Sequence, residues 1–172
     1  DMPLNLLATT LPLNAGLISG REKYRDWLVN YVDAWCERAR ANNDIFPANV
    51  GLSGKVGEHW DGRWWDCWEG RWDLFRGIRP ALENAMLLTG DTRYMDVLRR
   101  QIRVLYQNKV EVDGREYPPA YYDENGWGGR GNYRRELTRL YLTQFQDEDL
   151  QLIEEDVERR SDEAFSYRTG YF

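Results

Sequence analysis

A tryptophan-rich and highly charged stretch, Glu58 to Asp73, most constrains how this chain can fold. It reads EHWDGRWWDCWEGRWD and holds five of the eight tryptophans, five carboxylates and the only histidine. The tryptophans follow a largely helical spacing, but Gly62 and Gly70 interrupt it. Buried indoles and buried charges both need partners, so this mixture favours the wall of a concave site. Local packing of the stretch is the alternative.

Composition and charge exclude several classes of function. With 172 residues, the chain is long enough for one domain or for a piece of a larger one. A net charge of −6 argues against a nucleic-acid partner, which would require a basic surface. No apolar run approaches the roughly 20 residues of a membrane span, so no membrane partner is expected. A single histidine among scattered acids matches no zinc spacing, and we expect neither a metal nor a cofactor.

The sequence leaves two points undecided: where a signal peptide lies, and whether the two cysteines pair. The chain begins at Asp1 without an initiator methionine or a leader-like segment, so we expect that a signal peptide was removed or lies elsewhere. Cys36 lies on an expected helix and Cys67 within the tryptophan-rich stretch. Sequence alone does not decide whether they form a disulfide.

The first third of the chain predicts one strong helix. Residues 1–20 mix apolar residues with prolines and glycines, and we expect an extended lead-in. Residues 21–42 place their apolar side chains on one face at 3.6 residues per turn, which predicts an amphipathic helix. Residues 44–57 contain the proline and glycine residues typical of a long ordered loop, which leads into the tryptophan-rich stretch.

The second half predicts paired helices separated by an aromatic loop. Residues 79–89 and a helix that runs to about residue 108 are joined at Gly90 closely enough to be antiparallel neighbours. Residues 109–132 break the period, and Asp113 and Gly114 indicate a small β-hairpin. Two further helices are expected, over residues 133–143 and from about residue 147.

The segment ALENAMLLTGDTRYMDVLRRQIRVL, together with RDWLVNYVDAW, DIFPANVG and YPPAYYDENGW, resembles the α/α-toroid carbohydrate-active enzymes. This superfamily includes polysaccharide lyases and six-hairpin glycosidases. The resemblance covers residues 21–130 and implies an all-α fold of antiparallel helical hairpins, an incomplete toroid with long aromatic loops. Because the chain has too few helices for a whole toroid, residues 1–172 are either a single independent α/α-hairpin domain or a segment of a larger toroid, and we favour the segment.

The resemblance further implies a secreted or periplasmic lyase that cleaves a uronic-acid polysaccharide by β-elimination. Such a reaction needs a base, an acid and a group that neutralises the substrate carboxylate. Tyr121 or Tyr122 is the expected acid and base, and the candidate neutralisers are His59, Asn49, Arg115 and Arg130. The residues expected to contact sugar rings are Trp60, Trp64, Trp65, Trp68, Trp72, Trp127, Arg63 and Arg115.

Two other classes of function stay open. A glycoside hydrolase of the six-hairpin type would use two carboxylates, for which the available residues are Asp61, Asp66, Glu69 and Asp123. A non-catalytic sugar-binding module or a helical scaffold for protein contacts would use the same aromatic surface, because Trp, Tyr and Arg dominate interface hot spots. For each arginine or carboxylate named above, the alternative without a functional role is an ion pair on the protein surface.

Overall fold

The computed structural model describes the chain except for residues 66–67, 69, 71–73 and 168–172, and except for the side chains of residues 75 and 160–167. It contains two compact units, Asp1–Asn132 and Tyr133–Phe172. Each unit is a helical assembly in its own right, and the first also carries short β-strands. Among the described residues, no helix combines the length and the apolar character that crossing a membrane requires.

The N-terminal residues are helical, so the expected extended lead-in over residues 1–20 is wrong. A 3₁₀-helix, η1 (Pro3–Thr9), runs into α1 (Thr10–Ser19), which ends at Gly20 with a left-handed φ of 64°. η1 packs against the π-helical turn η2 (Leu74–Ile78), where the Pro3 carbonyl oxygen lies 2.0 Å from the site that a Cβ on Gly77 would occupy. This close backbone approach depends on residues far apart in sequence, and local composition does not reveal it.

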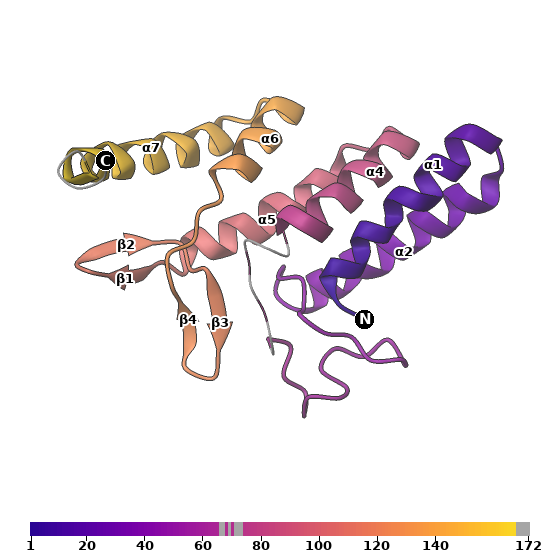
Figure 1. The fold of residues 1–172 in the computed structure, drawn as a ribbon, viewed down its shortest axis with the longest axis horizontal. Helices are drawn as coiled ribbons and strands as arrows, with labels where there is room; N and C mark the ends of the chain where they lie inside the picture. Colours follow the sequence, from indigo (N-terminus) through magenta and orange to yellow (C-terminus); the bar gives the residue numbers. More distant parts are fainter. Residues whose placement is uncertain (66–67, 69, 71–73, 168–172) are drawn as a thin grey trace. The chain divides into compact units, whose positions relative to one another are not determined.

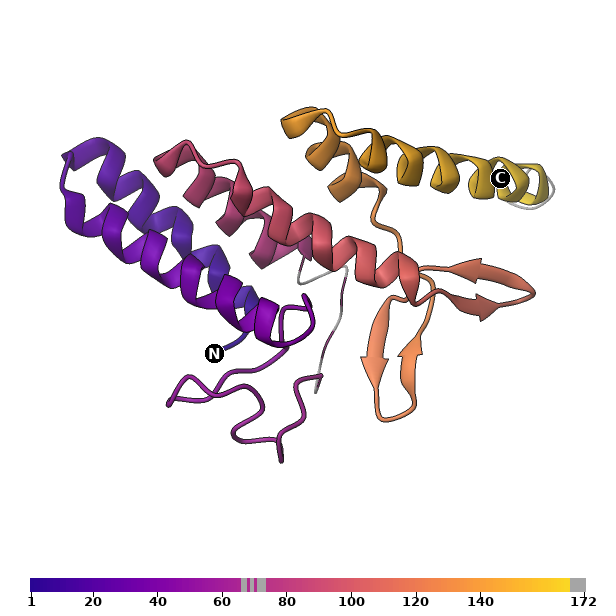
Figure 2. The same ribbon diagram turned by 180° about the vertical axis from the view of Figure 1, so that it is seen from behind.

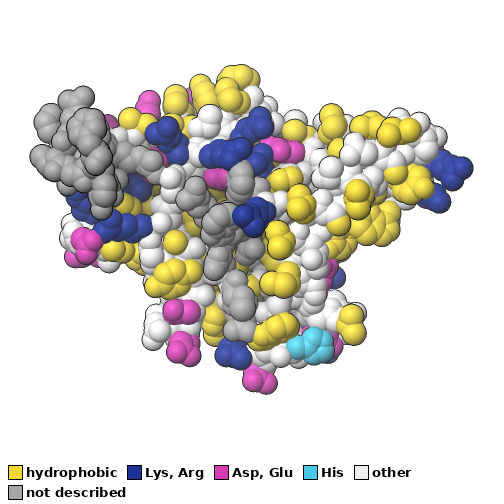
Figure 3. Space-filling view, in the orientation of Figure 1, with side chains coloured by type: hydrophobic (Ala, Val, Ile, Leu, Met, Phe, Trp, Pro, Cys, Tyr) yellow, Lys and Arg dark blue, Asp and Glu magenta, His cyan; other side chains and the backbone are white. Residues whose placement is uncertain are grey.

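The long amphipathic helix is confirmed as α2 (Glu22–Ala41). It lies beside α1 in both views of the ribbon (Figures 1 and 2). Its buried face consists of Leu28, Val32, Trp35, Cys36 and Ala39. Hydrophobic side chains also remain on the surface of the η1–α1 segment and the start of α2 (Figure 3). The exposed ones are Met2, Leu4, Leu7, Leu11, Leu17, Ile18 and Trp27.

The predicted helical hairpin is confirmed by α4 (Arg79–Thr89) and α5 (Arg93–Gln107). Gly90 ends α4 with a φ of 73°, and the Asp91 carboxylate accepts a hydrogen bond from the Arg93 backbone N–H at 2.9 Å. Such a bond satisfies one of the amide groups that a helix start leaves unpaired. The turn therefore has the glycine expected from sequence, and Asp91 pairs with the first amide group of α5.

Two antiparallel β-hairpins lie beyond the end of α5, so the all-α fold class is wrong (Figure 1). The first hairpin, β1 (Val110–Val112) with β2 (Arg115–Tyr117), turns at Asp113 and Gly114 as expected. The second, β3 (Tyr121–Asp123) with β4 (Gly126–Gly128), was not expected, and it turns at Glu124–Asn125. The chain combines helices with small sheets and is not an α/α-toroid.

The second unit is a helical hairpin of its own. α6 (Arg134–Gln144) ends at Phe145, which adopts a left-handed φ of 52°, and α7 (Asp147–Tyr167) returns along it. Within α7 the buried Asp156 pairs with Arg159 at 2.7 Å. Both helices were expected, and α7 continues beyond Arg159, where the sequence period is ambiguous.

Candidate functional site

Five aromatic side chains from two distant segments meet in one cluster, which we call the aromatic cluster: Trp64, Trp65, Trp68, Tyr122 and Trp127. Tyr122 lies at its centre, with ring centroids 4.8 Å from Trp64, 5.5 Å from Trp65 and 4.7 Å from Trp127. Trp68 closes the group at 5.3 Å from Trp127. Most of these contacts are tilted or edge-to-face, which suits the quadrupoles of aromatic rings.

The register of the second hairpin explains why two of these rings meet. Tyr122 and Trp127 are directly opposed across β3 and β4, so both side chains point to the same face. The loop before residue 66 supplies Trp64 and Trp65 to that face. The cross-strand pair Tyr122–Trp127 therefore packs against tryptophans that lie nearly sixty positions earlier in the sequence.

The loop that carries the tryptophans is fixed by backbone and side-chain hydrogen bonds. The Ala48 N–H donates to the Trp64 carbonyl at 2.8 Å, and Asn49 Nδ2 donates to the Arg63 carbonyl at 3.1 Å. Gly57 has a φ of 67°, and a Cβ there would lie 2.5 Å from the backbone of Gly62. The loop therefore holds its tryptophans in defined positions.

Burial divides the aromatic cluster into an anchor and a surface. Trp68 is only 2% exposed, and its indole N–H donates to the Phe46 carbonyl at 3.1 Å. The other four rings are only partly buried and keep part of their area accessible. Trp60 is also partly buried and lies beside His59, with ring centroids 6.3 Å apart. Trp72 lies outside the described residues.

The two candidate acid/base tyrosines lie on opposite faces of the hairpin. Tyr122 packs within the aromatic cluster, whereas Tyr121 is 43% exposed. The Tyr121 ring covers the backbone of β4, because a Cβ on Gly128 would lie 2.6 Å from it. Only a residue without a side chain leaves room for this packing. The two hydroxyl groups therefore have different surroundings.

The candidate neutralisers are dispersed. Asn49 is buried, and its Oδ1 atom has no hydrogen-bond partner among the described residues. His59 and Arg115 are exposed. Arg130 pairs with Asp113 and lies over the Tyr117 ring at 5.1 Å, while Arg63 donates to the Trp60 carbonyl at 3.1 Å.

The candidate carboxylates form no described pair. Asp61 is exposed in a turn with a φ of 52°. Asp123 accepts a hydrogen bond from the Asn125 N–H at 2.7 Å and so stabilises the β3–β4 turn. Asp66 and Glu69 lie outside the described residues. Within the part of the chain that the structure describes, no group of three or more His, Cys, Asp or Glu side chains is arranged to hold a metal ion.

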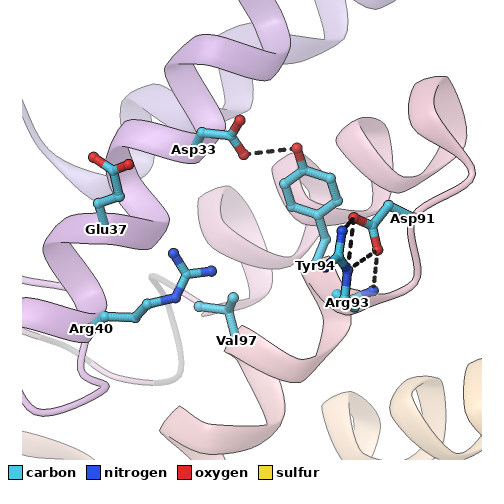
Figure 4. A pocket seen from close by; sticks show the side chains of 7 residues that line it. All are labelled: Asp33, Glu37, Arg40, Asp91, Arg93, Tyr94 and Val97. Atoms are coloured by element: carbon cyan, nitrogen blue, oxygen red, sulfur yellow. Dashed lines mark hydrogen bonds and ion pairs between the residues drawn. The ribbon is translucent and has the colours of Figure 1, made fainter.

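A second feature, which the sequence did not single out, is a polar pocket between α2 and the start of α5 (Figure 4). Its volume is about 370 Å³, and it is lined by Asp33, Glu37, Arg40, Asp91, Arg93, Tyr94 and Val97. The Tyr94 hydroxyl donates to Asp33 at 2.7 Å. Partial burial, followed by the charge and hydrogen bond of Asp33, raises the pKa of Tyr94. The sequence signal was present in the spacing of Asp33, Glu37 and Arg40, which places them on one helix face.

An apolar groove of about 510 Å³ lies between α1 and the start of α2. Leu11, Pro12, Ala15, Tyr24 and Trp27 form most of its lining, and the Lys23 ammonium lies over the Tyr24 ring at 4.9 Å. It is a hydrophobic surface with little polar content, and it differs in this respect from the pocket beside α5.

Residues 1–156 match the family described as Domain of unknown function (DUF8034), and the chain belongs to that family. No curated protein and no solved structure matches the chain significantly.

Proposed function

Starting from membership of a family without an assigned activity, we propose that this protein recognises a uronic-acid polysaccharide through the aromatic cluster and takes part in its cleavage by β-elimination. The single observation that carries the proposal is the set of four partly exposed rings, Trp64, Trp65, Tyr122 and Trp127, anchored on the buried Trp68. A polymeric substrate also implies a secreted or periplasmic protein.

Aromatic surfaces of this kind suit sugar rings. The C–H bonds on one face of a pyranose are weakly positive, and they pack against the negative face of an indole or phenol ring. Fixed rings lose little conformational entropy on binding, and the hydrogen bonds of the loop before residue 66 supply that rigidity. Stacking of a sugar ring on these side chains is therefore favourable.

The reaction follows from the tyrosines near the aromatic cluster. In β-elimination a base removes the proton α to the uronate carboxylate, the bond to the 4-oxygen breaks, and a carbon–carbon double bond forms. The proton then passes to the leaving oxygen. Either Tyr121 or Tyr122 is the candidate for both acid and base, and the exposed His59 and Arg115 are candidates to neutralise a carboxylate.

Replacement of one ring tests the binding step. We expect Trp64→Ala to weaken retention on a polyuronate gel about 10-fold, because a lost aromatic contact costs roughly 0.5–1.5 kcal/mol beyond its area. Trp27→Ala is the matched control, since Trp27 is half-exposed on α2 and has no contact with the aromatic cluster among the described residues. Equal retention of both variants and the unchanged protein would contradict the binding step.

Turnover of uronate polymers tests the reaction. A product that absorbs in the ultraviolet is expected, because elimination leaves a double bond conjugated to the carboxylate. Tyr121→Phe and Tyr122→Phe, made separately, should remove turnover in one case with the far-ultraviolet circular dichroism unchanged. Full activity in both variants refutes the tyrosine assignment. New reducing ends without absorbance would instead indicate hydrolysis, and retention without turnover would indicate a binding module.

A further inference from the structure

The polar pocket between α2 and α5 has the size of a small-ligand site and is open to solvent. Its volume of about 370 Å³ falls within the range of about 300–1,000 Å³ that such pockets occupy. Val97 is buried beneath it, and the Tyr94 ring forms part of the wall (Figure 4). The pocket draws its polar side chains from two helices that the Tyr94–Asp33 hydrogen bond joins.

Some of the charges in this pocket are already neutralised. The Arg93 guanidinium binds both carboxylate oxygens of Asp91, at distances from 2.7 to 3.1 Å. One oxygen of Asp33 accepts the Tyr94 hydroxyl at 2.7 Å. These contacts fix the positions of the polar side chains that α5 and the preceding turn contribute to the pocket.

Two charged side chains on α2 have no such partner. Glu37 and Arg40 both line the pocket and are exposed to solvent, and neither forms a hydrogen bond or an ion pair with another residue in the part of the chain that the structure describes. Although they are one helical turn apart, the Arg40 side chain extends toward Val97 and away from Glu37 (Figure 4). The second oxygen of Asp33 is an additional acceptor on the same face.

Charge balance selects the kind of ligand. The lining contains three carboxylates (Asp33, Glu37 and Asp91) and two guanidinium groups (Arg40 and Arg93), so its formal charge is −1. A ligand that carries only a carboxylate would increase this excess, and one that carries only an ammonium would leave Arg40 without a partner. A ligand with both groups can replace solvent at the two acids of α2 and at Arg40 together, through charge-assisted hydrogen bonds.

We propose that this pocket binds a small zwitterion of the amino-acid class, with its ammonium at Glu37 and Asp33 and its carboxylate at Arg40. This site is separate from the aromatic cluster, and it does not depend on the proposed carbohydrate function. Tyr94 and Val97 limit the space between the two charged ends.

Titration calorimetry with matched compounds tests the proposal. The probes are glycine, β-alanine, 4-aminobutyrate and 5-aminopentanoate, together with n-alkylamines, n-alkyl carboxylates of matching length, and glucose. We expect one amino acid to bind at least about 10-fold more tightly than either of its single-charge halves, since each charge-assisted bond contributes about that factor. The proposal is overturned if a half binds as tightly as the amino acid, if glucose binds best, or if no amino acid binds.

Variants of the two unpaired residues locate the site. Arg40→Gln should reduce binding of the amino acid to the level of the amine alone, and Glu37→Gln should reduce it to the level of the carboxylate alone. Arg25→Gln and Glu22→Gln are the matched controls, because both residues are exposed on α2 outside the pocket. Equal losses in a control and in its pocket variant overturn the assignment. Trp64→Ala should leave amino-acid binding unchanged, which separates this result from the carbohydrate test.

Discussion

At the scale of the single residue, Cys36 shows how burial changes chemistry. Its free thiol is only 2% exposed on the inner face of α2, and burial raises its pKa from 9.0 to about 12. The thiolate is the nucleophilic form, so this cysteine is inert near neutral pH. Cys67 lies outside the described residues.

The raised pKa of Cys36 predicts a loss of stability in alkali. The unfolded thiol ionises near pH 9, whereas the folded thiol stays protonated up to about pH 12, so the unfolded state gains from deprotonation between these values. Below about pH 9 the contribution is constant. We expect the urea midpoint to fall between pH 9 and 11, and to fall less steeply in Cys36→Ala. Parallel pH profiles for the two proteins would contradict this role of Cys36.

The Tyr94 hydroxyl gives a second prediction for a single group. Tyr94→Phe removes the hydrogen bond to Asp33 that joins α2 to α5, and it should lower the free energy of unfolding by about 0.5–1.5 kcal/mol. Denaturation in urea measures the change. Tyr121→Phe is the control, because its exposed ring keeps its packing on β4 and loses only the hydroxyl. A larger loss in the control would show that the cross-helix bond does not stabilise the fold.

At the scale of the element, two glycines in the tryptophan-bearing loop differ in a way that can be measured. Both have left-handed φ angles, 67° at Gly57 and 80° at Gly62. A Cβ on Gly57 would overlap the backbone of Gly62, whereas one on Gly62 meets nothing within 4 Å. Substitutions at the two glycines therefore distinguish the cost of a left-handed backbone from the cost of steric overlap.

We expect Gly62→Ala to cost about 1–2 kcal/mol, which is the penalty for a left-handed conformation alone. Gly57→Ala should cost more than about 3 kcal/mol, because the loop must also shift to relieve the overlap. Near-ultraviolet circular dichroism should change in Gly57→Ala and stay constant in Gly62→Ala, since only the former moves the tryptophans. Equal effects of the two variants would contradict the close contact.

The elements that sequence predicted are those that local periodicity determines. α2, α4 and α5 each bury one face, and their turn and cap residues lie nearby in sequence. The β3–β4 hairpin escaped prediction because β4 contains two glycines, which are unfavourable in strands, and because its stabilising contacts come from Trp64 and Trp65. Pairing between distant segments overrides local propensity here.

Candidate site residues were predictable to a similar extent. The concentration of tryptophans drew attention to the loop, but only contacts across the chain show that Trp68 is a buried anchor while Trp64 remains partly accessible. Glu37 and Arg40 have the sequence position and the exposure of an ordinary solvated helix face. Their relation to Tyr94 depends on how α2 packs on α5, which the sequence does not encode locally.

At the scale of the whole molecule, the division into two compact units makes a direct prediction. All eight tryptophans precede residue 133, so their fluorescence reports on the first unit alone. We expect a fragment of residues 1–132 to fold and to keep the blue-shifted emission of buried Trp35 and Trp68. Emission typical of exposed indole in the absence of urea would show that the first unit needs residues 133–172 for its stability.

The pairing of Tyr122 with Trp127 also limits how this hairpin can vary among related chains. Successive side chains of a strand point to opposite faces, so a slip by one residue exchanges Tyr121 and Tyr122. A single-residue insertion in the turn forces either that exchange or a bulge, whereas insertion of two residues preserves the face of every side chain. Relatives that keep the aromatic cluster should therefore have turns that differ by an even number of residues, or should carry a bulge beside the turn where the difference is odd.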